Sequence, residues 1–241
     1  MKFIFLTILN LFSLMTFSQN FKENQFKYER VKEAFYLKWP ELAENLKSQG
    51  INSDEFNIFI RVFKEEKILE IWVKNKNAKE FKLFKSYPIT YSSGIPGPKR
   101  KEGDLQVPEG FYFIDRFNPL SNFHLSLGIN YPNTSDKVLG DIKPGGDIFI
   151  HGSNVSIGCV PISDDKIKEV YTMAVMARNT GQKNIPVHIF PFELTEAKLE
   201  TKKTNPNYSF WKSLQIAYLY FNKTKTPPLV SMSKSGEYKI N

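Results

Sequence analysis

The sequence predicts an α+β protein, in which a mainly β domain carries helical additions at both ends. From Asn57 to about Arg116, apolar residues alternate with other residues, which is the period of β-strands. In residues 19–50, and again around 210–221, apolar residues recur instead at the spacing of amphipathic helices. A chain of 241 residues, 41% of them apolar and 24% charged, is long enough to bury a sizeable core.

Residues 1–18 predict export from the cytoplasm. Lys2 precedes an apolar run from Phe3 to Phe17, and the small residue Ser18 follows it. This pattern is typical of a secretory signal peptide, and we expect cleavage after Ser18. The alternative is an uncleaved anchor, but the run is shorter than the roughly 20 residues of a membrane span. No later stretch is apolar enough to span a bilayer, so we expect no stable membrane span.

Helical segments are expected at both ends of the chain, over residues 19–54 and 192–241. The N-terminal segment should pack on the main domain through apolar positions at helical spacing, namely Val31, Ala34, Phe35 and Leu37. Pro40 can open a second short helix, and Gly50 can end it. The C-terminal segment carries a helix pattern, then two prolines and a short strand-like end.

Residues 55–191 contain the strand-like segments, and we expect them to form one main domain. These segments lie at 56–62, 69–73, 80–93, 111–117, 123–130, 147–151 and 185–190. Residues 131–147 are predicted to form a long loop, and loops of this length are often functional. After that loop, Ser163 is the expected N-cap of a helix that ends near Gly181.

The formal charge of +8 and the pI of about 9.3 favour an anionic partner, such as a cell-envelope polymer. Nucleic acid is the rival interpretation. The sequence shows no zinc-ligand spacing, no aromatic RNA-binding signature and no dense block of Lys and Arg. We therefore expect no nucleic-acid partner, no metal and no cofactor.

The single cysteine, Cys159, is informative because exported proteins usually use cysteines in disulfide pairs. An unpaired cysteine is either a buried passenger or a reactive thiol. His151 ends a predicted strand, and the loop from it to Cys159 is short enough for the two side chains to meet. Histidine is the usual base for a thiol nucleophile. Gly152 and Gly158 give the loop conformations that other residues cannot reach, and the N–H of Cys159 could stabilise an oxyanion.

The segment 151–161 resembles the active-site signature of the L,D-transpeptidase catalytic domain, also called the YkuD domain. That family carries a His-Gly pair followed by Ser-x-Gly-Cys, and both halves stand here, as His151-Gly152 and Ser156-Ile157-Gly158-Cys159. Further segments are similar to an exported subgroup known as YafK-like: SYPITYSSG, GPKRKEGDLQVPEGFY, FHLSLGINYPN and SFWKSLQIAYLYFNKTKTPPL. The resemblance covers roughly residues 55–235.

The resemblance implies a mixed β-sandwich-like catalytic domain over residues 55–191 that acts on peptidoglycan stem peptides in the periplasm. It implies that Cys159 attacks a peptide bond next to diaminopimelate and forms a thioester acyl-enzyme, which an amine then resolves. His151 would carry the proton, and a backbone carbonyl would orient it. We expect this carbonyl to be that of Ser156 or Gly158, with no carboxylate as a third member.

One position departs from the family pattern. Many members have an arginine two residues after the cysteine, where this chain has Pro161. Basic residues elsewhere could hold the acidic substrate group, although a solvated turn is the alternative for the Lys-Arg-Lys loop. The predicted substrate-binding residues are Gly152, Lys99, Arg100 and His124.

Two other functions remain open. Water could resolve the acyl-enzyme, which would make the protein an amidase that cuts a diaminopimelate-linked peptide or envelope protein from peptidoglycan. The fold could instead be an inactive wall-binding module, which the intact pair of His151 and Cys159 disfavours. Glu102 and Asp104 resemble the paired carboxylates of glycan cleavage, but two acids in a Gly-rich loop are common.

Overall fold

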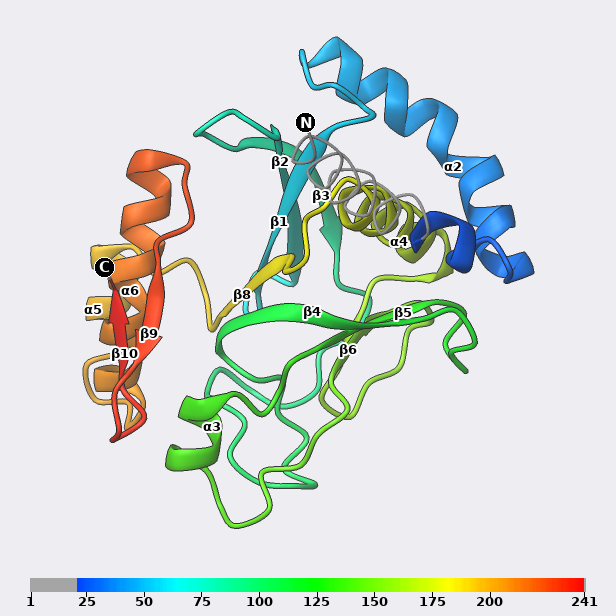
Figure 1. Cartoon of the computed structure of the whole chain (residues 1–241). Coiled ribbons are helices and arrows are strands. Elements are labelled where there is room, and N and C mark those ends of the chain that lie inside the picture. Colours follow the sequence, from blue (N-terminus) through cyan, green and yellow to red (C-terminus); the bar gives the residue numbers. More distant parts are fainter. Residues whose placement is uncertain (1–20, 241) are drawn as a thin grey trace, which may run out of the picture.

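The computed structural model describes residues 21–240, so the predicted signal peptide and its cleavage site lie outside the described part. A large sheet is combined with a few helices in that part, which confirms the predicted α+β class (Figure 1). The helices are α2 (Glu29–Ser48), α3 (Thr134–Leu139), α4 (Asp164–Asn179), α5 (Glu196–Glu200) and α6 (Tyr208–Thr224). The strands are β1 (Phe56–Phe63), β2 (Ile68–Asn75), β3 (Lys82–Pro88), β4 (Gly110–Asn118), β5 (Ser126–Ile129), β6 (Phe149–His151), β7 (Val160–Pro161), β8 (Pro186–Phe190), β9 (Val230–Met232) and β10 (Tyr238–Ile240).

Eight of the described strands form one mixed sheet, in the order β3-β2-β1-β8-β4-β5-β6-β7. β1 pairs in parallel with β8, and β6 in parallel with β7, whereas the other neighbours are antiparallel. Figure 1 shows β1 to β3 running across the direction of β4 and β5, so the sheet is strongly curled. The two shortest strands, β6 and β7, lie at one end of this sheet, and they carry the segment that contains His151 and Cys159.

Helices α2 and α4 pack against each other and cover the sheet beside β1 and β3 (Figure 1). α2 is continuous through Pro40, so the prediction that Pro40 opens a second helix was wrong. Proline removes only the bond to the carbonyl of Tyr36, and Tyr36 is 82% exposed, so water can satisfy that carbonyl. Buried residues on both sides of Pro40 keep the helix on one core: Val31, Ala34, Phe35, Leu42 and Leu46. Leu37, which was predicted to pack against the main domain, is instead exposed.

The C-terminal helices and the β9–β10 hairpin build a second apolar cluster against β1 and β8, with Phe63, Phe190 and Tyr218 among its members. Buried hydrogen bonds join this cluster to Glu109, in the Gly- and Pro-rich loop of residues 93–110. Trp211 Nε1 donates to Glu109 Oε2 at 2.9 Å, and Lys64 Nζ lies 2.9 Å from Glu109 Oε1.

The segment 131–147, predicted to be a loop, contains the short helix α3. Its start is a capping box: the Asn133 side chain accepts from the Asp136 N–H at 3.0 Å, and the Asp136 carboxylate accepts from the Asn133 N–H at 3.1 Å. Two orphan backbone donors are thereby satisfied, which explains why so short a helix forms here.

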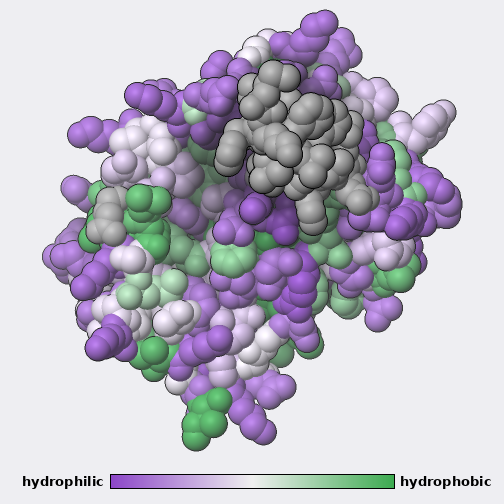
Figure 2. All heavy atoms as spheres, in the orientation of Figure 1, coloured by the Kyte–Doolittle hydropathy of each residue, from purple (hydrophilic) through white to green (hydrophobic). Residues whose placement is uncertain are grey.

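One further local prediction was wrong, and another was confirmed only in position. β5 begins at Ser126, so His124 lies in a turn, with φ +70°, and not in a strand. Ser163 precedes α4 as expected, but its φ is +74° and its side chain makes no capping hydrogen bond in the described structure. Within residues 21–240, no helix is both long and apolar enough to cross a bilayer. Hydrophilic residues cover much of the face seen in Figure 2, with smaller hydrophobic patches between them.

Candidate active site

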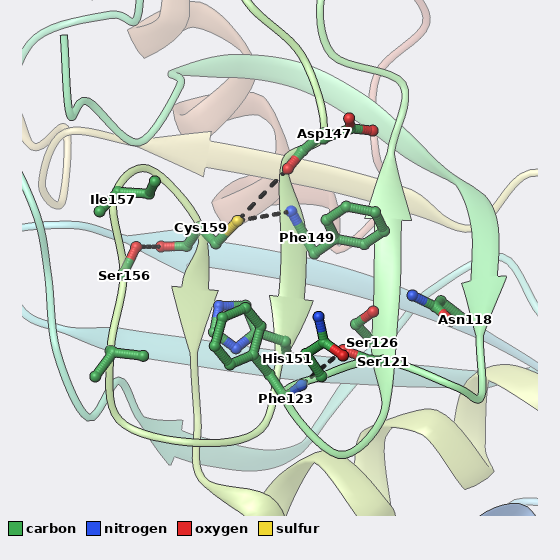
Figure 3. A pocket seen from close by; sticks show the side chains of 12 residues that line it. Asn118, Ser121, Phe123, Ser126, Asp147, Phe149, His151, Ser156, Ile157 and Cys159 are labelled. Atoms are coloured by element: carbon green, nitrogen blue, oxygen red, sulfur yellow. Dashed lines mark hydrogen bonds between the residues drawn. The ribbon is translucent and has the colours of Figure 1, made fainter. Parts of the chain in front are cut away.

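His151 and Cys159 lie at the β6–β7 end of the sheet. His151 ends β6, and Cys159 directly precedes β7, which pairs with β6 through Ile150 and Val160. Because side chains alternate along each strand, His151 and Cys159 project to the same side of this edge. Both side chains line one pocket (Figure 3).

The imidazole of His151 is held in one tautomer. Its Nδ1 lies 2.6 Å from the carbonyl oxygen of Gly152. Since a carbonyl oxygen can only accept, Nδ1 carries the proton and Nε2 of the neutral ring is left as the acceptor. The orienting carbonyl belongs to Gly152, so the prediction that Ser156 or Gly158 supplies it was wrong. Burial lowers the pKa of His151, and the Gly152 carbonyl and Asp164 oppose this in part, so the ring is neutral at neutral pH.

Gly152 lies where a larger residue does not fit. A Cβ at this position would come within 2.4 Å of Asp164 Oδ1 and 2.7 Å of the Phe123 carbonyl oxygen. The Gly152 N–H donates to that same carbonyl at 3.1 Å, and Asp164 Oδ1 accepts from the Ser153 N–H at 2.6 Å. Gly152 was predicted to bind substrate, but it is absent from the described pocket wall, and its backbone packs the loop against the neighbouring turn.

The thiol of Cys159 is half-buried and touches the backbone of β6. Sγ accepts from the Phe149 N–H at 3.4 Å and lies 3.6 Å from the Asp147 carbonyl oxygen (Figure 3). Burial raises the pKa of Cys159, and this outweighs the lowering by the Phe149 N–H and Lys99. A neutral thiol therefore shares the pocket with a neutral imidazole, and a proton must move before or during nucleophilic attack.

The Ser-x-Gly-Cys turn is held together by the hydroxyl of Ser156. Its Oγ accepts from the Gly158 N–H at 3.0 Å and donates to the Cys159 carbonyl at 2.8 Å. Gly158 has φ +139°, and a Cβ there would lie 3.1 Å from the Gln106 carbonyl oxygen. The turn thus requires glycine at this position, and Ser156 and Gly158 position the backbone of the nucleophile.

A cavity of about 430 Å³ opens over these side chains, with mainly apolar walls. Its described lining is Asn118, Ser121, Asn122, Phe123, Ser126, Asp147, Phe149, His151, Val155, Ser156, Ile157 and Cys159. Sequence analysis missed most of these residues. The ring of Phe123 lies 4.6 Å from that of His151, at 30°, so Phe123 forms a wall directly against the imidazole. No sequence pattern marked Phe123, because its position depends on how a turn packs on β6.

Lys99 and Arg100 were predicted to bind substrate, but both lie outside the described pocket lining. Lys99 is buried, and its Nζ bonds to Asp104 Oδ1 at 2.6 Å and to the Lys101 carbonyl at 2.9 Å. An Arg100 guanidinium nitrogen lies 3.7 Å from Asp136. Asp104 thus braces its own loop and does not face a partner carboxylate across a cleft.

His124 also lies outside the described lining, in the turn that carries Phe123. Its Nε2 is buried and has no hydrogen-bond partner among the described residues, and burial lowers the pKa of its ring. Its carbonyl oxygen accepts from Arg30 of α2 at 2.9 Å. His124 therefore contacts the helical segment more directly than it contacts the nucleophile.

Comparison with known proteins identifies the family of this chain. The model of the L,D-transpeptidase catalytic domain, YkuD, matches residues 57–189, and the chain belongs to that family. Among individual relatives, it is 36% identical over 186 residues to the protein named "Putative L,D-transpeptidase YafK" of Escherichia coli (strain K12); the match covers 76% of this chain and 74% of the relative. YafK of Escherichia coli O157:H7 matches to the same extent.

Two solved structures were also found to be similar. One is the helical cell shape determining protein Pgp2 from Campylobacter jejuni, with a TM-score of 0.46 and 20% identity, covering 75% of this chain and 74% of that one. The other is Bd1075 from Bdellovibrio bacteriovorus, with a TM-score of 0.41 and 21% identity, covering 73% and 77%.

Proposed function

We propose that this protein is a peptidoglycan-acting cysteine L,D-transpeptidase of the cell envelope, exported to the periplasm. The observation that carries the proposal is the Gly152 carbonyl 2.6 Å from Nδ1 of His151. It leaves Nε2 as the proton acceptor in the pocket that also holds the thiol of Cys159. Family membership supplies the substrate class, a stem peptide that contains diaminopimelate.

The proposed reaction has two halves. In the first, the Cys159 proton passes to Nε2 of His151 while Sγ bonds to the substrate carbonyl carbon; the C–N bond then breaks, and the imidazolium returns the proton to the leaving amine. In the second, an amine attacks the thioester, loses its proton to His151, and releases the thiol. The N–H of Cys159 is a candidate donor to the oxyanion, because the braced turn holds it rigidly.

Transfer is favoured over hydrolysis by a second cavity beside the first. This more open cavity, of about 350 Å³, is lined by Tyr91, Asn154, Val155 and Ser156. It shares Val155 and Ser156 with the pocket over the thiol. An acceptor amine has to be oriented to compete with water, and two cavities along one loop suit two stem peptides.

The amidase remains the second candidate because of Pro161. This residue occupies the usual arginine position, is buried, and its carbonyl accepts from the Thr90 N–H at 2.9 Å. A different mode of binding the donor stem would suit a protein that cleaves diaminopimelate-linked bonds already present in peptidoglycan. In that case a peptide or envelope protein attached through diaminopimelate would be the substrate.

Mass spectrometry of product mixtures distinguishes the candidates. The purified protein is incubated first with disaccharide-tetrapeptides alone, and then with muropeptides that carry a peptide attached through diaminopimelate; the Cys159→Ala variant is the control. Dimers or exchanged terminal residues from the first substrate establish the transpeptidase. Release of the attached peptide without dimers establishes the amidase. No product, with Cys159 unreactive toward iodoacetamide at neutral pH, identifies a wall-binding module.

A further inference from the structure

Arg116 shares a row of the sheet with the nucleophile. A bulge between Ile114 and Arg116 shifts the β4–β5 register, so that Arg116 lies opposite Gly128. Gly128 lies opposite Phe149 on β6. The next residue of β6, Ile150, pairs with Val160 of β7, which directly follows Cys159. Bulges beside active sites commonly redirect a side chain. At about 4.8 Å between strands, Arg116 and Cys159 are about 14 Å apart along this row, Cα to Cα.

The missing side chain at Gly128 leaves room for Arg116. A Cβ at Gly128 would lie 2.8 Å from Arg116 Nε and 3.1 Å from Phe149 Cε1. The guanidinium instead lies over the Phe149 ring, 4.9 Å from its centroid. The same Phe149 lines the pocket and donates its N–H to Sγ of Cys159. Arg116 is thus stacked on the residue that contacts the nucleophile.

Asp147 completes a charged pair at the pocket. Arg116 Nη1 lies 2.6 Å from Asp147 Oδ1, and the Asp147 side chain is 82% exposed. Asp147 lines the pocket, its carbonyl oxygen lies 3.6 Å from Sγ, and its φ is +54° (Figure 3). A non-glycine residue in this backbone region is uncommon and is often found at functional sites. Asp115 holds Nε of the same guanidinium at 3.1 Å.

The pair is available to a ligand. None of the described residues that line the pocket is Lys or Arg, but the Arg116 guanidinium contacts the side chains of two of them, Asp147 and Phe149. An exposed ion pair contributes little to stability, so exchanging it for ligand contacts costs little. A guanidinium next to a carboxylate can bind a ligand that carries a carboxylate and an ammonium on one carbon, because each ligand group then meets the opposite charge.

We infer that Arg116 and Asp147 bind the free α-amino-carboxylate end of the substrate's diamino acid, and so select stems that carry this end. This inference rests on the proposed function. The carboxylate would pair with Arg116 and the ammonium with Asp147, while the methylene chain crosses Phe149 toward the thiol. Arg116 of β4 would thereby supply the positive charge that many family members place at the position of Pro161.

The test compares three tetrapeptide stems: one with diaminopimelate, one with its free carboxylate amidated, and one with lysine at the same position. Arg116→Gln should lower kcat/KM for the diaminopimelate stem about 10- to 100-fold, the effect of losing a charge-assisted hydrogen bond. Its kcat/KM for the lysine stem should stay within about twofold of wild type, because that stem never made the contact. Asp147→Asn should weaken use of all three stems, because each carries the ammonium, and asparagine tolerates the same backbone region.

Arg178→Gln is the matched control, because Arg178 also stacks on a phenylalanine, Phe21, outside the site. Equal loss by Arg116→Gln on all three stems, or no loss on any, would overturn the inference. If Arg116→Gln folds poorly, Arg116→Lys replaces it. Calorimetry then compares the binding of each stem to Cys159→Ala with its binding to the Cys159→Ala, Arg116→Lys double variant. If the Arg116→Lys protein binds all stems more weakly but still prefers the diaminopimelate stem over the lysine stem, the charge at position 116 selects the substrate. If its affinity for every stem equals that of Cys159→Ala, the inference is overturned. Wild type that neither converts nor binds any stem refutes the proposed function itself.

Discussion

His151 and His188 lie on strands of the same sheet, and burial lowers the pKa of each imidazole, but their surroundings differ. His188, on β8, is enclosed by aromatic rings: those of Phe59 and Phe111 lie edge-on, each 4.7 Å from the imidazole centroid. Burial, with a smaller contribution from Arg61, lowers the pKa of His188 to about 3. It cannot exchange a proton with a substrate.

His151 is also buried, with 1% of its surface exposed, yet it lines the cavity over the thiol. Its strand and β7 are only three and two residues long, so the chain leaves the sheet at once and forms the pocket loop. The comparison teaches that burial supplies a neutral imidazole both in the middle of the sheet, on β8, and at its β6–β7 end. A general base additionally needs a fixed tautomer and access, and only His151 has both.

The largest expected effect is the loss of activity in Cys159→Ala, which removes the thiol from the pocket that His151 lines. Acyl-enzyme formation should be abolished, since the chain has no other cysteine. The thiol is half-buried and makes only weak contacts, so the unfolding temperature should stay close to that of wild type. Intact-mass analysis with muropeptide substrates measures the first effect, and thermal unfolding measures the second. Any turnover above background by Cys159→Ala would remove the thiol from the mechanism.

The next effect separates the two histidines. His151→Ala should lower turnover about 10²- to 10⁴-fold, the usual contribution of a general base, in a protein that remains folded. His188→Gln should leave turnover per folded molecule near wild type, because this ring is enclosed away from the cavity. Steady-state kinetics corrected for the folded fraction make the comparison. Similar losses in both variants would contradict the distinction between a neutral ring and an accessible base.

A smaller effect concerns stability against pH. A histidine with a folded pKa of about 3 stays neutral while the unfolded chain takes up a proton below about 6.5, so stability falls as pH falls through that window. Between pH 7 and pH 5, His188 should cost about 2 kcal/mol of the free energy of unfolding. His188→Gln should lose this dependence, as measured by urea unfolding at both pH values. Parallel slopes for wild type and variant would show that His188 does not titrate in this way.

The sequence predicted the elements whose signal is local and long. Strands β1 and β2 carry apolar residues at every second position, and α4 and α6 have long periodic apolar faces, so they were expected near their observed positions. α3 was missed because a six-residue helix depends on the Asn133–Asp136 capping box more than on periodicity. β7 was missed because it has two residues and ends in Pro161, which cannot donate a strand hydrogen bond.

The site divides in the same way. His151 and Cys159 are close in sequence and belong to one motif, so their presence in one pocket could be anticipated. Phe123 and Asp147 reach the pocket wall through the packing of a turn and an unusual backbone angle, and a bulge brings Arg116 to the lining residues Asp147 and Phe149. These depend on tertiary register, which spacing along the chain does not encode. Charge alone pointed instead to Lys99, whose ammonium is paired inside its own loop.

The smallest expected effect tests whether the N-terminal helix supports the catalytic end of the sheet. Arg30 of α2 donates through Nη1 to the carbonyl oxygens of Ser121 at 2.7 Å and His124 at 2.9 Å, on either side of Phe123. Arg30→Gln should loosen this turn and raise KM about two- to fivefold, the effect of one net hydrogen bond, with kcat little changed because His151 keeps its Gly152 carbonyl. Lys32→Gln, which removes an exposed ion pair to Glu29 on the same helix, is the matched control. If both variants shift KM equally, or if kcat falls while KM does not change, the helix does not act through the pocket wall.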